Sequence, residues 1–138
     1  LIKQHEGLRL FPYRDPIGLM TIGYGHLIQP GEVFPPKITE GEAETLLLKD
    51  TEIAQRAVRE SVKVPLTQNQ FDALVSLVFN IGVGAFKSST LLRVLNGGFY
   101  QAAAEQFLVW KRAGNKPDLL LPRRRREKEL FETPDGIA

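Results

Sequence analysis

The sequence predicts an α+β fold, in which one long helix joins a small N-terminal β-hairpin lobe to a larger helical lobe. Three observations indicate this arrangement. Proline and glycine repeatedly interrupt residues 11–35, apolar residues then recur at helical period over 39–62, and helix signals continue over 65–132. We therefore expect one domain over residues 1–138, with its β lobe, connecting helix and helical lobe in that order.

The N-terminal part is predicted to be a short helix followed by a small sheet. Apolar residues at the start of the chain suggest an amphipathic helix that ends near Gly7, because glycine is a natural helix stop. Short β-favouring pieces, Met20-Thr21-Ile22 and Val33-Phe34, then lie between turn-forming residues. They predict a hairpin sheet.

Capping patterns mark the predicted helices. Thr39-x-x-Glu42 opens the long helix, which runs to about Val62. Thr67-x-x-Gln70 opens a strongly apolar helix that Gly82 stops. Three further helices are predicted: from Ser88 or Ser89 to Leu95, from Tyr100 to Lys111, and from Pro122 to Phe131.

The composition excludes several classes of protein. The 138 residues are 43% hydrophobic and 25% charged, which is ordinary for a globular domain. There is no cysteine and there are only two histidines, so we expect neither a metal site nor a cofactor. No apolar run approaches the roughly 20 residues of a membrane span, so no stable membrane insertion of this chain is expected.

A run of four arginines, residues 123–126, is the most conspicuous charged feature. Glu127 and Glu129 follow closely, and such a mixed block is typical of a solvated helix face. Nucleic-acid binding requires basic residues spread over a surface that also offers stacking aromatics. With a net charge of only +2, the chain shows no such organisation, and we expect no nucleic-acid partner.

The chemistry-bearing feature is a pair of carboxylates and a hydroxyl, in the order Glu6-x8-Asp15-x5-Thr21. Two acids are what glycoside hydrolysis needs, because one protonates the leaving oxygen and the other manages water or the developing cation. Each residue also has a simpler interpretation. Glu6 alone is a solvated carboxylate at a helix end, Asp15 a turn former, and Thr21 a β-branched strand residue.

Two further positions allow both a structural and a functional interpretation. Gly25 marks either a β-bulge or a close approach of the backbone to a sugar. Asn80, just before Gly82, is either a helix C-cap or a hydrogen-bonding partner of a sugar acetamido group.

The motifs resemble the phage-type lysozymes, glycoside hydrolase family 24, over nearly the whole chain and in the family's order. The matching segments are Glu6-Gly7-Leu8-Arg9-Leu10, Tyr13-Arg14-Asp15, Thr21-Ile22-Gly23-Tyr24-Gly25-His26, Ile38-Thr39-x-x-Glu42-Ala43-Glu44, Phe79-Asn80-Ile81-Gly82, Gly84-Ala85-Phe86, Trp110 and Arg123-Arg124-x-x-Glu127.

This resemblance implies a lysozyme-like α+β fold and hydrolysis of the β-1,4 bond between N-acetylmuramic acid and N-acetylglucosamine in peptidoglycan. Carried over residue by residue, Glu6 matches the general acid and Asp15 the second carboxylate. Thr21 matches the hydroxyl that helps to hold the attacking water. An enzyme that positions water in this way is expected to invert the anomeric configuration.

Six further residues receive roles in the same way. The resemblance implies an ion pair between His26 and Asp50, and a pairing of Arg124 with Glu6. Substrate binding is expected at three positions, which are Asn80, Gly25 and Phe86.

The expected function is that of a monomeric phage endolysin. It would be made in the cytoplasm of the host bacterium, and peptidoglycan in the periplasm would be its partner. A lytic transglycosylase is one alternative, although it has no need of a water held by Asp15 and Thr21. A catalytically silent wall-binding module of the same fold is the other, and the intact Glu6, Asp15 and Thr21 set argues against it.

Overall fold

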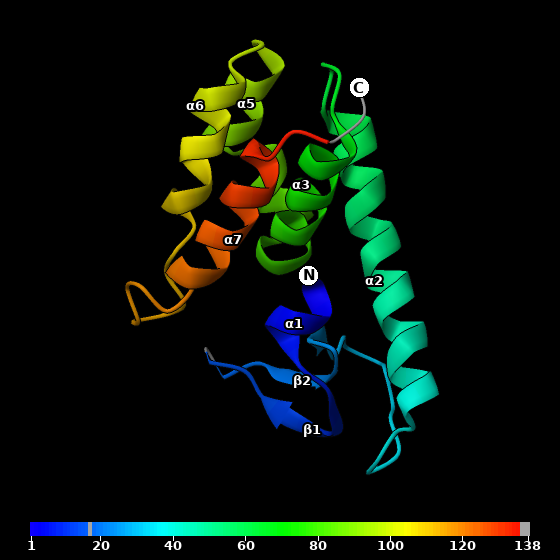
Figure 1. Ribbon diagram of the computed structural model, residues 1–138. Helices are drawn as coiled ribbons and strands as arrows, with labels where there is room; N and C mark the ends of the chain where they lie inside the picture. Colours follow the sequence, from blue (N-terminus) through cyan, green and yellow to red (C-terminus); the bar gives the residue numbers. More distant parts are fainter. Residues whose placement is uncertain (17, 136–138) are drawn as a thin grey trace. The chain divides into compact units, whose positions relative to one another are not determined.

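The computed structural model describes residues 1–16 and 18–135 and has the predicted α+β fold (Figure 1). Its elements in chain order are α1 (Ile2–Glu6), β1 (Arg9–Arg14), β2 (Met20–Gly23), β3 (His26–Leu27), α2 (Glu40–Ser61), α3 (Gln68–Ile81), α4 (Val83–Lys87), α5 (Thr90–Asn96), α6 (Tyr100–Gln106), a 3₁₀ turn (Phe107–Val109) and α7 (Leu121–Glu132). Among the described residues, no helix combines the length and apolar character that a membrane crossing requires.

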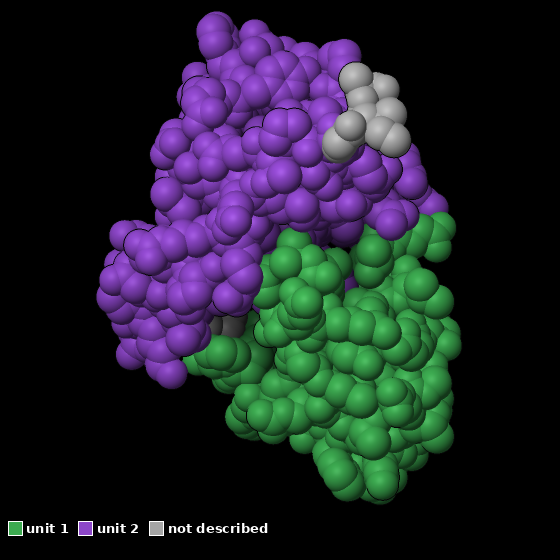
Figure 2. Space-filling view, viewed as in Figure 1, with its two compact units in different colours: residues 1–52 green, residues 53–138 purple. Residues whose placement is uncertain are grey.

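The chain divides into two compact units, residues 1–52 and 53–138 (Figure 2). The boundary falls within α2, so this helix contributes residues to both units. Its N-terminus carries the predicted capping box, since Thr39 Oγ1 accepts from the Glu42 N–H and Glu42 Oε1 accepts from the Thr39 N–H. The observed bounds lie within one residue of the predicted range 39–62.

The first unit contains an antiparallel sheet of order β1-β2-β3. Strand β1 was not predicted, because Pro12 argues against a strand interior. The proline is tolerated because β1 is an edge strand, and because the register shifts between Arg9 and Tyr13. The predicted strand at Val33-Phe34 is wrong, since neither residue lies in a strand. Phe34 instead packs against the core of this unit from a loop.

That core is small. Its buried members are Ile22, Tyr24, Ile38 and Ala43, contributed by the sheet region and the first turns of α2. Partly buried residues that complete it are Leu10, Ile28, Phe34, Leu46 and Leu47. The core therefore packs Ile22 of β2 against α2, and the same strand carries Thr21.

The second unit is helical and has a larger core. The predicted caps are confirmed: Thr67 forms a capping box with Gln70 at the start of α3, and Ser89 accepts from the Leu92 N–H at the start of α5. Helix α6 ends at Gln106, earlier than predicted, because the chain tightens into a 3₁₀ turn and leaves helical geometry at Trp110. The short helix α4, directly after Gly82, was not predicted.

Helix α3 also donates hydrogen bonds to the segment that follows α7. The Asp135 carboxylate accepts from the backbone N–H groups of Gln68 and Asn69, at 2.7 and 3.1 Å. The Asn69 side-chain amide donates to the Thr133 carbonyl at 3.0 Å. Together with Thr67, this segment satisfies N–H groups that the first turn of a helix leaves without an internal partner.

Candidate active site

Glu6 is the last residue of α1, and its side chain lies directly against the backbone at Gly25. Gly7 ends the helix with a φ of 68°, which turns the chain toward β1. Gly25 has a φ of +74°, and a Cβ atom built on it would come within 2.6 Å of Glu6 Cδ. The close approach expected at Gly25 is therefore made by the Glu6 carboxyl group, and a sugar contact at Gly25 stays a prediction.

Asp15 and Thr21 are held by the turn between β1 and β2. The Asp15 N–H donates to the Leu19 carbonyl at 2.8 Å, and the Leu19 N–H donates to Asp15 Oδ1 at 2.8 Å. The Thr21 hydroxyl donates to the same Leu19 carbonyl at 3.0 Å. Leu19 thus bridges the carboxylate to the hydroxyl, and all three candidate catalytic residues belong to the first unit.

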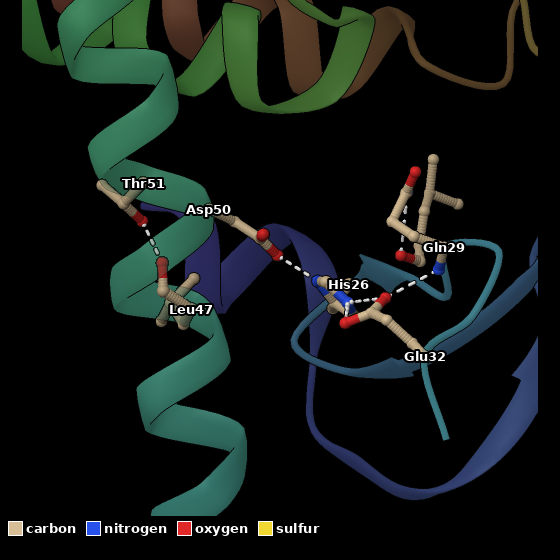
Figure 3. A network of polar contacts seen from close by, with 7 residues as sticks. His26, Gln29, Glu32, Leu47, Asp50 and Thr51 are labelled. Atoms are coloured by element: carbon tan, nitrogen blue, oxygen red, sulfur yellow. Dashed lines mark hydrogen bonds and ion pairs between the residues drawn. The ribbon is translucent and has the colours of Figure 1, made fainter. Parts of the chain in front are cut away.

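His26 lies between two carboxylates (Figure 3). Its Nδ1 is 2.8 Å from Asp50 Oδ2 on α2, the contact that the resemblance implies, and its Nε2 is 2.9 Å from Glu32 Oε1. Burial lowers the pKa of His26, but the hydrogen bonds to Asp50 and Glu32 outweigh it, so the pKa lies above its ordinary value. The imidazole therefore connects the end of the sheet to α2.

Glu32 was not singled out from the sequence. It also accepts from the Gln29 N–H at 2.6 Å, and this backbone hydrogen bond is the main reason why the pKa of Glu32 is lowered. The residue sits in an irregular segment without periodicity. No local pattern in the sequence therefore marks it as a partner of His26.

Arg124 is fully buried within the second unit. Its Nε lies 2.7 Å from Glu127 Oε1, and Ser76 Oγ donates to the other Glu127 oxygen at 2.5 Å. Burial raises the pKa of Glu127, although Arg124 and Ser76 oppose the rise. Because Glu6 belongs to the other unit, the expected pairing of Arg124 with Glu6 stays a prediction.

The sequence marked Glu127 only as part of the arginine motif, and its burial was not predicted. An Arg and a Glu three residues apart on a helix lie on one face, and that spacing was the available signal. The block of arginines was predicted to be a solvated face. Arg125 and Arg126 are exposed, whereas Arg123 and Arg124 are buried.

Two predicted substrate-binding residues have different environments in the second unit. Phe86 is fully buried in the second unit, and its expected role in substrate binding stays a prediction. Asn80 lies within α3, whose C-cap is Gly82, so it is not itself the cap. Its Oδ1 is buried and has no hydrogen-bond partner among the described residues, and its binding role stays a prediction.

Comparison with known proteins gives the same fold and family. Residues 3–129 match the sequence profile of the family described as phage lysozyme. The endolysin of Salmonella phage P22 is 49% identical over 136 residues, covering 94% of this chain and 91% of that protein. The endolysin of Acyrthosiphon pisum secondary endosymbiont phage 1 is 46% identical over 140 residues, covering 96% of this chain and 93% of that protein.

Solved structures support the same assignment of fold and family. A crystal structure of a P22 lysozyme mutant superposes with a TM-score of 0.79 at 49% identity, covering 96% of this chain and 92% of that chain. The muramidase domain of SpmX from Asticaccaulis excentricus gives a TM-score of 0.82 at 41% identity, with the same coverage of 96% and 92%. By sequence and by fold, the chain belongs to the phage lysozyme family.

Proposed function

We propose that this phage lysozyme hydrolyses the β-1,4 bond between N-acetylmuramic acid and N-acetylglucosamine with inversion, using Glu6, Asp15 and Thr21. Membership of the family makes the chain a lysozyme-type glycoside hydrolase, an endolysin that degrades peptidoglycan in host lysis. The bond, the stereochemistry and the residues are the proposal. The observation that carries it is the hydrogen-bonded β1–β2 turn, in which Leu19 joins Asp15 to Thr21.

The two carboxylates divide the work in this mechanism. Glu6 protonates the glycosidic oxygen as the bond breaks. Asp15 accepts a proton from water, and the Thr21 hydroxyl oxygen orients that water toward the anomeric carbon on the opposite face of the ring. Because the Thr21 O–H already donates to Leu19, its oxygen lone pairs are the groups left to accept from the water.

The inverting route requires a specific spacing. Carboxyl groups roughly 6.5–9.5 Å apart leave room for a water molecule, whereas a separation near 5 Å indicates a covalent, retaining route. We propose the wider spacing for Glu6 and Asp15. The anomeric configuration of the first product, followed by NMR, distinguishes the two routes.

We further propose that the protein is made in the cytoplasm of the host and acts as a monomer on peptidoglycan in the periplasm. The family establishes the cell wall as the target, and the endolysins to which the chain is similar support this compartment. Fractionation of host cells during lysis, followed by sedimentation of the purified protein, tests both statements.

The catalytic assignment is tested by replacing Glu6 with glutamine. We expect Glu6→Gln to lose at least about 100-fold in the clearing of permeabilised Gram-negative cells, because an amide cannot supply the proton. Glu129→Gln is the matched control, since it removes the same charge from an exposed side chain on α7.

Mass spectrometry of the released muropeptides separates the alternatives. Products with a reducing muramic acid end support hydrolysis, whereas anhydro-muramic acid products would mean a lytic transglycosylase. A folded wild-type protein that binds sacculi without cleaving them would leave only a wall-binding module. Full activity of Glu6→Gln would contradict the role given to Glu6.

A further inference from the structure

Tyr13 lies in the strand pair that carries Asp15 and Thr21, the two residues proposed to hold and deprotonate the attacking water. In the β1–β2 ladder, Tyr13 is directly opposite Thr21, and side chains of directly opposed residues stand on the same face of a sheet. Asp15 follows two residues later, and its backbone continues the pairing through Leu19. Asp15 directly follows β1, which ends at Arg14, and because its N–H still pairs with Leu19 the two-residue alternation extends to it and puts it on the face of Tyr13.

The Tyr13 ring is also fixed from within its own strand. The Arg9 guanidinium lies over the ring, with its carbon 5.1 Å from the ring centroid. Such a cation over an aromatic face is attracted by the electrons of the ring. The side chain is half-buried, so it is held by its neighbours and still reached by solvent.

The charges around Tyr13 keep its hydroxyl protonated. Burial raises the pKa of Tyr13, and the carboxylates of Glu6 and Asp15 raise it further, while Arg9 opposes them. These influences leave Tyr13 as a neutral phenol at ordinary pH. As a neutral phenol it offers an O–H donor that can stabilise negative charge or hold a water molecule.

We propose that Tyr13, braced by Arg9, is a positioning residue that fixes Asp15, Thr21 and the water between them. The proposal rests on the function proposed above. It adds a donor to a site in which Asp15 and Thr21 supply acceptors. It also assigns a role to Arg9, because the stacked guanidinium restricts the Tyr13 ring to one orientation.

The first test is Tyr13→Phe, which keeps the ring and its stacking and removes only the hydroxyl. We expect kcat on peptidoglycan to fall about tenfold with little change in KM, because the contact acts on the reacting water rather than on substrate binding. The pH profile of kcat should shift as well, because the lost hydroxyl belongs to the groups proposed to hold and deprotonate the water. A purely structural role would not move the profile.

Two further variants sharpen the result. Arg9→Met keeps an unbranched side chain but removes the cation, and should reduce kcat in the same direction by a smaller factor. Tyr100→Phe is the control, because Tyr100 donates to the Pro65 carbonyl in the second unit and is remote in sequence from the site. We expect Tyr100→Phe to keep the wild-type kcat and pH profile.

A titration that does not depend on activity tests the geometry. Ultraviolet absorbance follows tyrosine ionisation, and the difference between wild type and Tyr13→Phe isolates Tyr13 from the other two tyrosines. Glu6→Gln should let Tyr13 ionise at lower pH, because it removes a nearby negative charge. Glu44→Gln should leave the titration unchanged, since Glu44 pairs with Lys3.

Failure of this proposal can be told apart from failure of the proposed function. If Glu6→Gln is inactive while Tyr13→Phe keeps the wild-type kcat and pH profile, the role of Tyr13 is overturned and the function stands. A Tyr13 titration that is the same in wild type and Glu6→Gln also overturns the role of Tyr13. A folded wild type that leaves peptidoglycan intact overturns both proposals.

Discussion

At the scale of single residues, the tightest constraint on the site is the contact between Gly25 and Glu6. Gly25 adopts a φ of +74°, which L side chains rarely adopt, and the space where a Cβ atom would stand is filled by the Glu6 side chain. The glycine therefore serves two needs, because it permits the backbone turn and leaves room for the carboxyl group.

Gly25→Ala should damage activity more than stability. The strained backbone costs about 1–2 kcal/mol in the free energy of unfolding. The new methyl group also displaces the Glu6 carboxyl, and a misplaced catalytic group lowers kcat by about 100-fold. Thermal unfolding and turnover of peptidoglycan measure the two effects separately.

Gly31→Ala is the control for this substitution. Gly31 has a φ of +86°, but a Cβ atom there would meet nothing within 4 Å. It should show a similar loss of stability with activity close to wild type. Equal losses of activity in the two variants would mean that backbone strain, and not the Glu6 contact, explains the effect of Gly25→Ala.

At the scale of elements, the sheet and α2 are joined through His26, Asp50 and Glu32 (Figure 3). The pKa of His26 is raised in the fold, so the stability it contributes is complete below the unfolded value of about 6.5. It is lost as the pH rises through the folded pKa. For Glu32 the pKa is lowered, so its contribution is present above its ordinary value of 4.5 and lost as the pH falls through the folded pKa.

Urea unfolding of His26→Gln at two pH values checks this reasoning. The loss of stability relative to wild type should be larger at about pH 5.5 than at about pH 9, because the His26 ring of the wild type is protonated at the lower pH and neutral at the higher pH. Glu32→Gln should reduce the same pH dependence without removing it, since Asp50 remains on the other ring nitrogen. Equal losses at both pH values would show that His26 acts through packing alone.

The helices were largely predictable, because their signals are local. Capping boxes and apolar periodicity fixed the starts of α2 and α3 within one residue. Strand β1 was not predictable in this way, because an edge position and a shifted register, both of which depend on β2, allow Pro12 inside it. Phe34 misled for the opposite reason: it has strand propensity but packs from a loop, edge-on to the His26 ring.

The candidate site was likewise predictable only where its signals are local in the sequence. The spacing of Glu6, Asp15 and Thr21 was visible in the sequence, and so was the family. The bridging role of Leu19 depends on its backbone groups, which the identity of a residue does not reveal. The motif that led to the substrate assignment of Phe86 does not reveal that its side chain is fully buried.

At the scale of the whole molecule, the two units differ in the apolar surface that they bury. Among the residues that the structure describes, the first has four buried apolar side chains and an edge strand that contains proline. The second has many fully buried residues, among them Leu74, Leu77 and Phe107. Cooperative units with few buried contacts open at lower free-energy cost.

Hydrogen exchange should therefore separate the units. We expect backbone amides in the middle of α3 to exchange roughly tenfold or more slowly than those of β2, because α3 opens only when the larger core does. Exchange of the Leu77 and Ile22 amides, followed by NMR, compares two residues that are both fully buried. Equal rates would mean that the chain opens as a single cooperative block.

The hydrogen bonds that the first turn of α3 donates to Asp135 also have a consequence for synthesis on the ribosome. The Gln68 N–H emerges 67 residues before the carboxylate that accepts from it. While the chain is being made, that turn has the Thr67 cap but not the Asp135 carboxylate. A nascent α3 is thus expected to fray at its N-terminus until residue 135 has emerged from the ribosome, and the last described residue completes a helix begun near the middle of the chain.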